Sequence, residues 1–450
     1  MAHRIHFLRP GVVGKDGRTS AIVAALEKSP RVKEPVIRLS DWKGGLARDA
    51  EKEVIEQAKL LRPDFVVIGP EEPLAEGIVN KLAKEGIPCV GPTETLAQLE
   101  SSKAFTRQLL SEFEIPGNPE YHVFKRMEGM EECLQRMTGY VVKPDGLTGG
   151  KGVKISDAHL FSIEDALLYC NDLFTAGHKA VVIEEKLEGE EFSLMSFCDG
   201  VHVVDMIPVQ DHKRVGVGDT GSNTGGMGSY SCANHRLPFL LPKQLKEASM
   251  INKAVAKALY KKTGEKFQGI LYGGFMITSS GLRLLEYNAR FGDPETLNVL
   301  ALLKSDFATI CEAMIRGDLT NGHVEFERLA TVCKYVVPDN YPDNPVKDKE
   351  IFLTAVPKES DTLRIYDAAV NKRNGKVYLT GSRAMAFVGI GDDLQEAERI
   401  AEEAASSVKG PVFHRWDIGT PRLIQERVDH MRQLAAEVSR RSRIRSSLAS

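Results

Sequence analysis

The stretch LRLLEYNARFGDPET, residues 282–296, holds the densest group of side chains that could do chemistry. Glu286 and Asn288 are two residues apart in a predicted strand, so their side chains point to one face. A carboxylate and an amide oxygen form a hard-oxygen site for Mg²⁺ (or Mn²⁺) that also holds nucleotide phosphates. Arg290 follows on that face and can bind an oxyanion through two hydrogen bonds. The group predicts a metal and phosphate site; a surface salt bridge at a strand end is the plainer alternative.

The glycine-rich stretch VKPDGLTGGKGV, from Val142 to Val153, is a second candidate phosphate site. It is not a Walker A loop, because Gly152 follows Lys151 where Ser or Thr belongs. It is not a dinucleotide fingerprint either, because Ile155 stands at the third glycine position. Short β-like runs flank the stretch. It therefore predicts a flap that closes over phosphates, or else an ordinary surface turn.

Two further clusters are polar. VVIEEKLEGEEFSL, residues 181–194, runs from an apolar strand into paired glutamates that suit ribose hydroxyls, although such glutamates are often a solvated turn. QDHKRVGVGDTGSNTGGMGSY, residues 210–230, places basic residues before a second glycine-rich loop, which favours a polyanionic substrate. His212 has no partner at ligand spacing, so we interpret it as a surface or hydrogen-bonding histidine.

The elements that must position these groups predict an α/β fold. In residues 1–102, strands at 4–8, 64–70 and 88–92 alternate with helices at 19–29 and 74–86, which predicts a parallel substrate domain. Ligands of such sheets bind beyond the carboxyl ends of the strands, here at 14–18, 69–72 and 91–93.

The remaining chain divides into three further parts. Residues 103–327 begin with a helix at 103–113, include a separate lid at about 121–185, and continue with strands at 191–200 and 282–292 around a helix at 244–263. Residues 328–425 carry strands at 330–337, 351–356 and 384–391 and a helix at 392–408. Residues 426–450 are basic and polar, which predicts a frayed, solvated tail.

Composition excludes several classes of protein. The chain has 450 residues, 42% hydrophobic and 27% charged, with a net charge of −3, which favours neither nucleic-acid nor membrane binding. Its 7 cysteines are scattered without a C-x-x-C pair, so we expect free thiols in a reducing compartment. The first fifteen residues lack the long apolar core of a signal peptide, and we expect a cytoplasmic protein.

The order of these pieces resembles the phosphoribosylamine–glycine ligase family of ATP-grasp enzymes. It runs from Lys103 at a helix start through Lys143 and GLTGGKG to an EE-x-L-x-G-E-E hinge, then QDHKR, NTGGMG and E-x-N-x-RFGDPE. The resemblance extends from GPEEPL to RWDIG at Arg415–Gly419, and it covers nearly the whole chain. It implies an N-terminal parallel-sheet domain, an ATP-grasp core with a mobile lid, and a small C-terminal α+β domain.

The resemblance also implies an activity. Glycine is ligated to 5-phosphoribosylamine with ATP, through glycyl phosphate, in purine biosynthesis, by a monomer or weak dimer that binds neither nucleic acid nor membrane. ATP, the co-substrate, would contact Lys103, Lys143, Gly149, Gly150, Lys151, Gly152, Glu184, Glu185, Leu187 and Glu191. The other substrates would contact Gly14, Gly17, Arg18, Glu71, Asp211, Lys213, Arg214, Arg290 and Asp293. Glu286 and Asn288 would hold the metal, and Arg290, Lys143 and Asp211 would be catalytic.

One loop departs from the family, which has GNGGREHA where this chain has GKDGRTSA, residues 14–21. Arg18 follows a glycine at a helix start, where free backbone N–H groups favour an anion. The hydroxyls of Thr19 and Ser20 can still donate to phosphate oxygens, so their replacement of the family's Glu and His need not destroy the acceptor site. A ligase with a different amine acceptor is the alternative. A non-catalytic descendant is disfavoured because Glu286, Asn288, Lys143 and Arg290 are all present.

Overall fold

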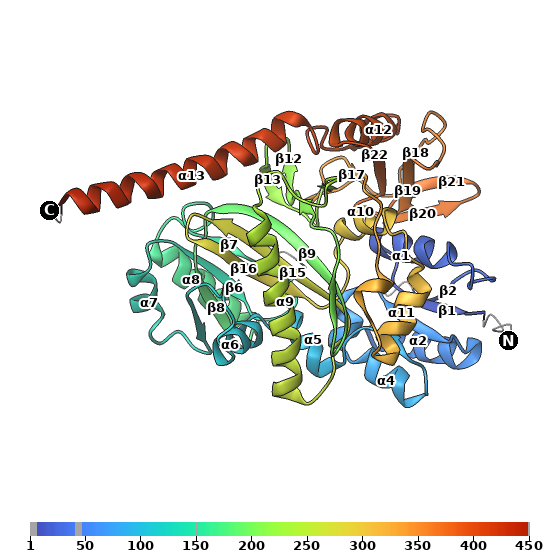
Figure 1. The fold of residues 1–450 in the computed structure, drawn as a ribbon, viewed down its shortest axis with the longest axis horizontal. Coiled ribbons are helices and arrows are strands. Elements are labelled where there is room, and N and C mark those ends of the chain that lie inside the picture. The colour runs from blue at the N-terminus through green and yellow to red at the C-terminus, as the bar shows by residue number, and fades with distance from the viewer. Residues whose placement is uncertain (1–6, 41–46, 150–151, 449–450) are drawn as a thin grey trace.

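The structure is a computed structural model that describes residues 7–40, 47–149 and 152–448 (Figure 1). The N-terminal part is a parallel sheet of order β2-β1-β3-β4. Phe65 and Val67 of β3 enter one apolar core and Val66 and Ile68 the other, so the strand is buried on both faces as predicted. The elements are β1 (Pro10–Val13), α1 (Gly17–Glu27), β2 (Ile37–Ser40), α2 (Ala47–Leu61), β3 (Phe65–Ile68), α3 (Glu71–Ala75), α4 (Ile78–Lys84), β4 (Cys89–Val90) and α5 (Glu94–Ser101).

Two predicted elements of this part differ from the structure. The strand expected at residues 4–8 begins outside the described residues, and β1 instead starts at Pro10, whose missing N–H is tolerated at the first position of a strand. The helix expected at 74–86 is two helices, α3 and α4, separated at Gly77. Gly77 has a φ of 74°, a left-handed conformation that interrupts a right-handed helix.

The central part is an antiparallel sheet of order β10-β9-β15-β16. Helix α9 covers one face, where the Asn252 side chain donates to the Leu194 carbonyl over 3.1 Å and accepts from the Tyr287 hydroxyl over 2.7 Å. The opposite face is left for the site. The elements are α6 (Lys103–Glu112), β9 (Gly189–Asp199), β10 (Val203–Asp205), β11 (Gln210–Asp211), β12 (Arg214–Gly216), β13 (Thr220–Asn223), β14 (Gly228–Ser231), α9 (Pro242–Thr263), β15 (Gln268–Thr278), β16 (Gly281–Asn288), α10 (Glu295–Ala301), α11 (Phe307–Arg316) and the 3₁₀ helix η1 (Asn321–His323).

The segment expected to be a lid forms a separate antiparallel sheet of order β5-β8-β6-β7. Its own apolar core includes Cys133, Val142 and Ile183. Because its side chains pack mainly on one another, the segment has the construction of an independent unit. Its elements are β5 (Tyr121–Phe124), α7 (Met130–Arg136), β6 (Tyr140–Pro144), β7 (Lys154–Ile155), α8 (Ile163–Thr175) and β8 (Val181–Glu185).

The C-terminal part forms a separate sheet of order β11-β14-β17-β22-β19, which includes β11 and β14 from the central part of the chain. Strand β17 pairs with β14 on one side and with β22 on the other, and α12 packs against β17 and β22. The strand expected at 351–356 is reduced to β18. The elements are β17 (Ala330–Pro338), β18 (Glu350–Ile351), β19 (Leu363–Asp367), β20 (Val370–Arg373), β21 (Lys376–Leu379), β22 (Met385–Gly391), α12 (Leu394–Ser406), β23 (Val412–Phe413) and α13 (Pro421–Leu448).

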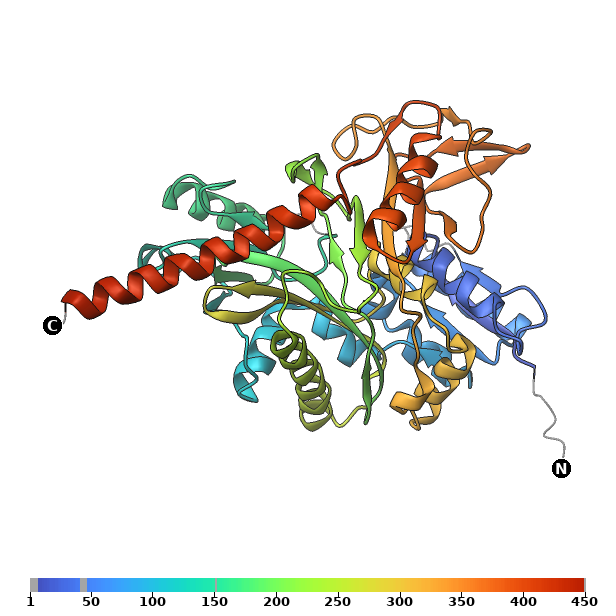
Figure 2. The ribbon, with the colours of Figure 1, turned by 45° about the horizontal axis from the view of Figure 1, so that its top comes forward.

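The prediction of a frayed tail was wrong. Residues 421–448 form the continuous helix α13, which extends beyond the rest of the ribbon in both views (Figures 1 and 2). Val428 and Met431 pack against the main core, and Leu434 is only 7% exposed. The apolar residues at helical spacing outweigh the surrounding charge, because they give one face of the helix a surface to bury.

All seven cysteines are free and buried, in agreement with the sequence. In the part of the chain that the structure describes, no helix is both long and apolar enough to cross a membrane.

Candidate active site

The face of β16 opposite α9 carries the predicted metal group. Tyr287 and Ala289 are buried, whereas Glu286 is exposed and Asn288 and Arg290 are partly exposed, so the three functional side chains share one face as predicted. Gly274 of β15 lies opposite Glu286, where a Cβ atom would come within 3.3 Å of the Glu286 side chain. The absence of a side chain there leaves space beside the carboxylate.

Cations from separate elements gather around Glu286. Although the Glu286 side chain reaches solvent, desolvation by the surrounding protein opposes ionisation of its carboxyl, but the charges of Lys213, Lys143 and Lys103, with Arg290, hold its pKa below its usual range. These residues come from α6, β6, the approach to β12 and the end of β16. The structure therefore brings together residues up to 187 positions apart, taking Lys103 and Arg290 as the extremes.

Lys143 is held by a buried ion-pair network. Its Nζ lies 2.7 Å from Glu184 Oε2, and Arg107 binds the same carboxylate through Nε at 2.7 Å and a second nitrogen at 2.9 Å. Burial raises the pKa of Glu184, but Arg107 and Lys143 overcome it and lower the pKa to about 2. Glu184 is thus the counter-ion that fixes Lys143, and its side chain is not free for the nucleotide.

Arg107 belongs to this network, and the sequence reasoning did not single it out. It lies four positions after Lys103 on α6, so the two side chains share a helix face. Its guanidinium also donates to the Leu284 and Leu285 carbonyls over 3.0 and 2.6 Å. The four-residue spacing between Arg107 and Lys103, a predicted ATP-binding residue, was the signal in the sequence that could have identified it.

The base of the glycine-rich flap is tied to α6. Lys103 Nζ donates to the Gly146 carbonyl over 2.8 Å, and Asp145 accepts from the Ser102 hydroxyl and the Ala104 amide, each over 3.1 Å. Gly149 and Gly152 have positive φ values of 58° and 100°. The predicted residues Gly150 and Lys151 lie outside the described residues.

Glu185, Leu187 and Glu191 follow the lid's last strand. Glu185 accepts from the Glu120 amide over 3.0 Å, and Leu187 is partly exposed. Glu191, at the start of β9, lies 3.1 Å from Lys213 Nζ. The pKa of Lys213 is raised well above its usual range, first by Glu191 and then by Asp211.

Asp211, His212 and Arg214 are near neighbours in sequence but lie in different surroundings. Burial, opposed by Lys213 and reinforced by Glu295, raises the pKa of Asp211 to about 7. Arg214 instead donates to the Gly221 carbonyl across the β12–β13 hairpin, over 2.8 Å. Our interpretation of His212 was wrong, because it is 2% exposed and neither ring nitrogen has a hydrogen-bond partner within the described residues.

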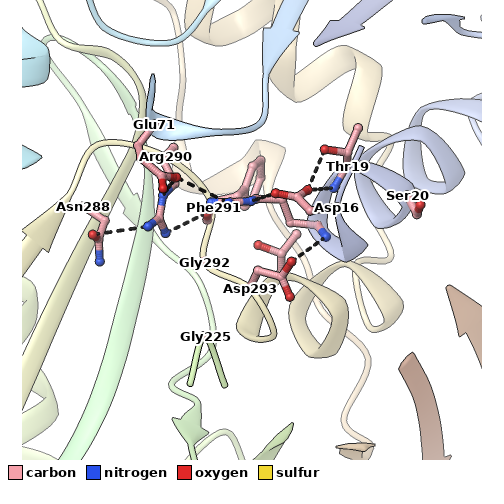
Figure 3. A network of polar contacts seen from close by, with 12 residues as sticks. Asp16, Thr19, Ser20, Glu71, Gly225, Asn288, Arg290, Phe291, Gly292 and Asp293 are labelled. Carbon is pink, nitrogen blue, oxygen red and sulfur yellow. Dashed lines mark hydrogen bonds and ion pairs between the residues drawn. The ribbon is translucent and has the colours of Figure 1, made fainter. Parts of the chain in front are cut away.

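A second network joins the N-terminal part to β16 (Figure 3). Arg290 lies 3.3 Å from Glu71 and 2.9 Å from Glu100, while Arg18 lies 2.5 Å from Asp16 and 3.4 Å from Glu71. Burial raises the pKa of Glu100 to about 7, and Arg290 followed by Arg18 lowers that of Glu71 to about 2 against the effect of burial. Asp16 and Glu100 were not singled out in the sequence.

The loop before α1 is closely packed against the C-terminal part. A Cβ atom on Gly17 would come within 1.9 Å of the Tyr335 hydroxyl, which bonds Asp293 over 2.6 Å. A Cβ on Gly14 would come within 2.5 Å of the Thr19 hydroxyl. Both positions therefore require glycine.

The hydroxyls of Thr19 and Ser20 both have partners within the chain. The Thr19 hydroxyl donates to Asp16 over 2.6 Å, and Ser20 donates to the Asp367 carbonyl over 2.7 Å. Asp16 also accepts from the Thr19 amide over 2.9 Å and caps α1. A carboxylate of the chain thus occupies the helix N-terminus that was expected to receive a phosphate.

The donor set at Glu286 and Asn288 fits a hard divalent cation. Within residues 7–40, 47–149 and 152–448, no group of three His, Cys, Asp or Glu side chains could hold a metal ion by itself. Mg²⁺ is commonly bound by one or two protein oxygens together with substrate phosphates. A metal here would therefore be completed by a nucleotide, whose phosphates Lys143 and Lys103 are placed to meet.

Comparison with known proteins places the chain in a family. Residues 10–100 match the N domain of phosphoribosylglycinamide synthetase, residues 101–296 its ATP-grasp (A) domain, and residues 331–421 its C domain. A phosphoribosylamine–glycine ligase of Methanocella arvoryzae is 44% identical over 430 residues, covering 93% of this chain and 98% of the relative.

Solved structures agree with this match. The crystal structure of phosphoribosylamine–glycine ligase from Thermotoga maritima has a TM-score of 0.74 at 29% identity, covering 91% of this chain and all of that one. Biotin carboxylase from Campylobacter jejuni has a TM-score of 0.71 at 12% identity, covering 95% of this chain and 99% of that one, and shares the fold. The chain belongs to the phosphoribosylglycinamide synthetase family, and it has the ATP-grasp fold.

Proposed function

We propose that this chain ligates glycine to 5-phosphoribosylamine at the expense of ATP, forming glycinamide ribonucleotide, ADP and phosphate. The observation that carries the proposal is the cation cluster around Glu286. Lys103, Lys143, Lys213 and Arg290 face a carboxylate that is open to solvent, as transfer of a phosphoryl group between anions requires.

The first step would join the glycine carboxylate to the γ-phosphoryl group of ATP and release ADP. Both reactants are anionic, so catalysis depends on neutralising charge and fixing position. Lys143 and Lys103 would hold the phosphates, and Arg290 would steady the acyl phosphate. A divalent metal, Mg²⁺ or Mn²⁺, held by Glu286 and Asn288 would supply further positive charge.

Nucleotide recognition would use the junction between β8 and β9. The main chain from Glu185 to Leu187 follows the last lid strand and would frame the adenine, and Glu191 would meet the ribose. The flap from Gly149 to Gly152 would cover the phosphates. Closure of the lid would keep water away from glycyl phosphate, which hydrolyses readily.

The acceptor would lie against the network of Arg18, Glu71 and Arg290, with Asp293 at its edge. This network offers guanidinium groups to a phosphate and carboxylates to ribose hydroxyls. Since Asp16 caps α1, the phosphate would share Arg18 with Asp16 and would not sit on the free helix terminus. Asp211 and Lys213 would face the same space from β11 and the β12–β13 hairpin.

In the second step the amine of 5-phosphoribosylamine would attack the acyl carbon and displace phosphate. Asp211 is the group best suited to take the amine proton, because its pKa of about 7 allows it to be ionised yet basic near neutrality. We further propose a cytoplasmic enzyme acting as a monomer or weak dimer.

Rescue of a purine-auxotrophic strain that lacks its own ligase tests the proposal. The chain should restore growth without added purine, and the matched variant Glu286→Gln, expressed to the same level, should not. In a parallel assay, ADP release with glycine should require 5-phosphoribosylamine among a panel of amines. Absence of rescue by a well-expressed chain, or ADP release driven by a different amine, would overturn the assignment of the acceptor.

A further inference from the structure

Helix α13 lies beyond the residues that match the C domain, yet its charged side chains reach two elements of the site. Arg427 forms an ion pair with Asp219, between the strands of the β12–β13 hairpin, and its Nε lies 3.5 Å from Glu190 of β9. His430, one turn later, lies 2.6 Å from the other oxygen of Glu190. One guanidinium thus bridges two segments about 29 residues apart in sequence, at positions 190 and 219.

The two bridged segments carry functional side chains. Glu190 precedes Glu191, the proposed ribose ligand, and it stands where the lid's last strand passes into the central sheet. The β12–β13 hairpin follows Lys213 and includes Arg214. Lys213, which belongs to the cluster around Glu286, and Glu191 already join the same two segments over 3.1 Å. Arg427 is therefore the outer counterpart of a contact inside the site.

The bridge is partly buried and belongs to a larger network, with Asp219 27% exposed in its side chain. The Glu190 side chain is 6% exposed and that of Arg427 is 19% exposed, so their charges are poorly screened by water. Arg415 binds Asp219 over 2.6 Å and Asp417 over 2.6 Å, and the Gly218 amide donates to Asp417 over 2.9 Å. The tip of the hairpin is held from the C-terminal part by this set of contacts.

Attachment of α13 does not itself require these charges. Val428, Met431 and Leu434 already pack the helix against the body. Burying a guanidinium between two carboxylates costs desolvation that apolar contacts avoid. The pairing of Arg427 with Asp219 and Glu190 is explained if it holds the β12–β13 hairpin in register with the junction between β8 and β9.

We propose that Arg427 is a positioning residue. It couples the β12–β13 hairpin, which follows Lys213, to the junction between β8 and β9, where the nucleotide would bind. The inference rests on the proposed function for its kinetic consequence, but not for its structural one. Without Arg427, Asp219 keeps Arg415 and Glu190 keeps His430, but the two segments lose their shared partner. The contact between Lys213 and Glu191 must then hold the segments in register without that support. Binding of nucleotide at the junction is then no longer transmitted to the hairpin.

The test compares Arg427→Ala with Arg427→Lys and with the control Arg432→Ala. Arg432 lies on the same helix, is 72% exposed in its side chain and pairs only locally with Asp429 among the contacts described. Hydrogen exchange at residues 214–223 should slow when the wild type binds a non-hydrolysable ATP analogue with Mg²⁺. This protection should be lost in Arg427→Ala, partly kept in Arg427→Lys and unchanged in Arg432→Ala.

Kinetics supply the second readout. In Arg427→Ala, KM for ATP and for 5-phosphoribosylamine should each rise about tenfold, roughly the effect of one lost charge-assisted hydrogen bond, while KM for glycine changes less. Asp219→Asn, which removes the other end of the bridge, should reproduce the effect. Normal nucleotide-dependent protection in Arg427→Ala, or a lowered melting temperature with unchanged KM values, would overturn the proposal. Because the exchange experiment needs only nucleotide binding, it remains informative if the acceptor is a different amine.

Discussion

Replacing Glu184 by Gln should reveal the cost of the buried network that fixes Lys143. The side chain is 4% exposed and pairs with Arg107 and Lys143. Its pKa falls from 4.5 to about 2 on folding, which at 1.36 kcal/mol per pH unit corresponds to about 3 kcal/mol of stability at neutral pH. This agrees with the ~3–5 kcal/mol lost when one partner of a buried ion pair is removed. The melting temperature should fall by roughly 6–12 °C, at about 2–4 °C per kcal/mol.

The sign of the pH dependence follows from a lowered pKa. The stabilisation by Glu184 is fully present above the unfolded pKa of about 4.5 and is lost as the pH falls toward about 2. Urea unfolding at pH 7.5 and at pH 3 should therefore show a larger difference between wild type and Glu184→Gln at the higher pH. The exposed Glu188, between β8 and β9, provides the control Glu188→Gln, which should match the wild type at both pH values. Equal stability of Glu184→Gln and wild type at pH 7.5 would refute the reasoning.

Three further predictions address the metal, the flap and the first loop. Glu286→Gln should lower kcat at least about a hundredfold while ATP affinity weakens only modestly, because a metal held by Glu286 would stabilise the charge that builds on the transferring phosphoryl group; near-normal turnover at saturating Mg²⁺ would exclude the metal site. Hydrogen exchange at residues 143–149 should slow with an ATP analogue and Mg²⁺, and unchanged protection would argue for a static loop. Gly17→Ala should unfold or inactivate the enzyme because its Cβ meets the Tyr335 hydroxyl at 1.9 Å, and Tyr335→Phe should partly rescue it; no rescue would place the strain elsewhere.

Local patterns predicted the site where its geometry is local. Glu286, Asn288 and Arg290 share a face because the side chains of a strand alternate, and the structure confirms it. The buried strand β3 was recognised from a different local pattern, since a continuous run of β-branched residues is typical of a strand covered on both faces. Patterns of period two need no knowledge of the rest of the chain.

Tertiary pairing could not be predicted in this way. Nothing in the sequence around Glu184 indicates that Arg107 neutralises it, and an exposed ribose ligand was the equally reasonable expectation. Asp16 caps the helix terminus that we assigned to a phosphate, because an Asp at the N-cap position accepts from a free amide of the first turn. His212 was misjudged because charged neighbours in sequence favour an exposed side chain, whereas its ring is buried.

For helix α13, the sequence predicted a solvated tail where the structure has a partly packed helix. Its charged and polar residues together outnumber its apolar ones in sequence, which favours a solvated tail, but Leu434 and its neighbours supply the buried face that stabilises a helix. Ion pairs to Glu190 and Asp219 then give some of its charges fixed partners. Composition alone does not distinguish a charge that is solvated from one that is paired.

Isotope transfer tests the central claim most directly. The purified chain is supplied with ATP, Mg²⁺, 5-phosphoribosylamine and glycine labelled with ¹⁸O in its carboxylate, and the products are measured by mass spectrometry. The proposed reaction predicts equal amounts of glycinamide ribonucleotide, ADP and phosphate, with one glycine oxygen in each phosphate released. ADP formed without glycinamide ribonucleotide, or phosphate free of the label, would contradict it.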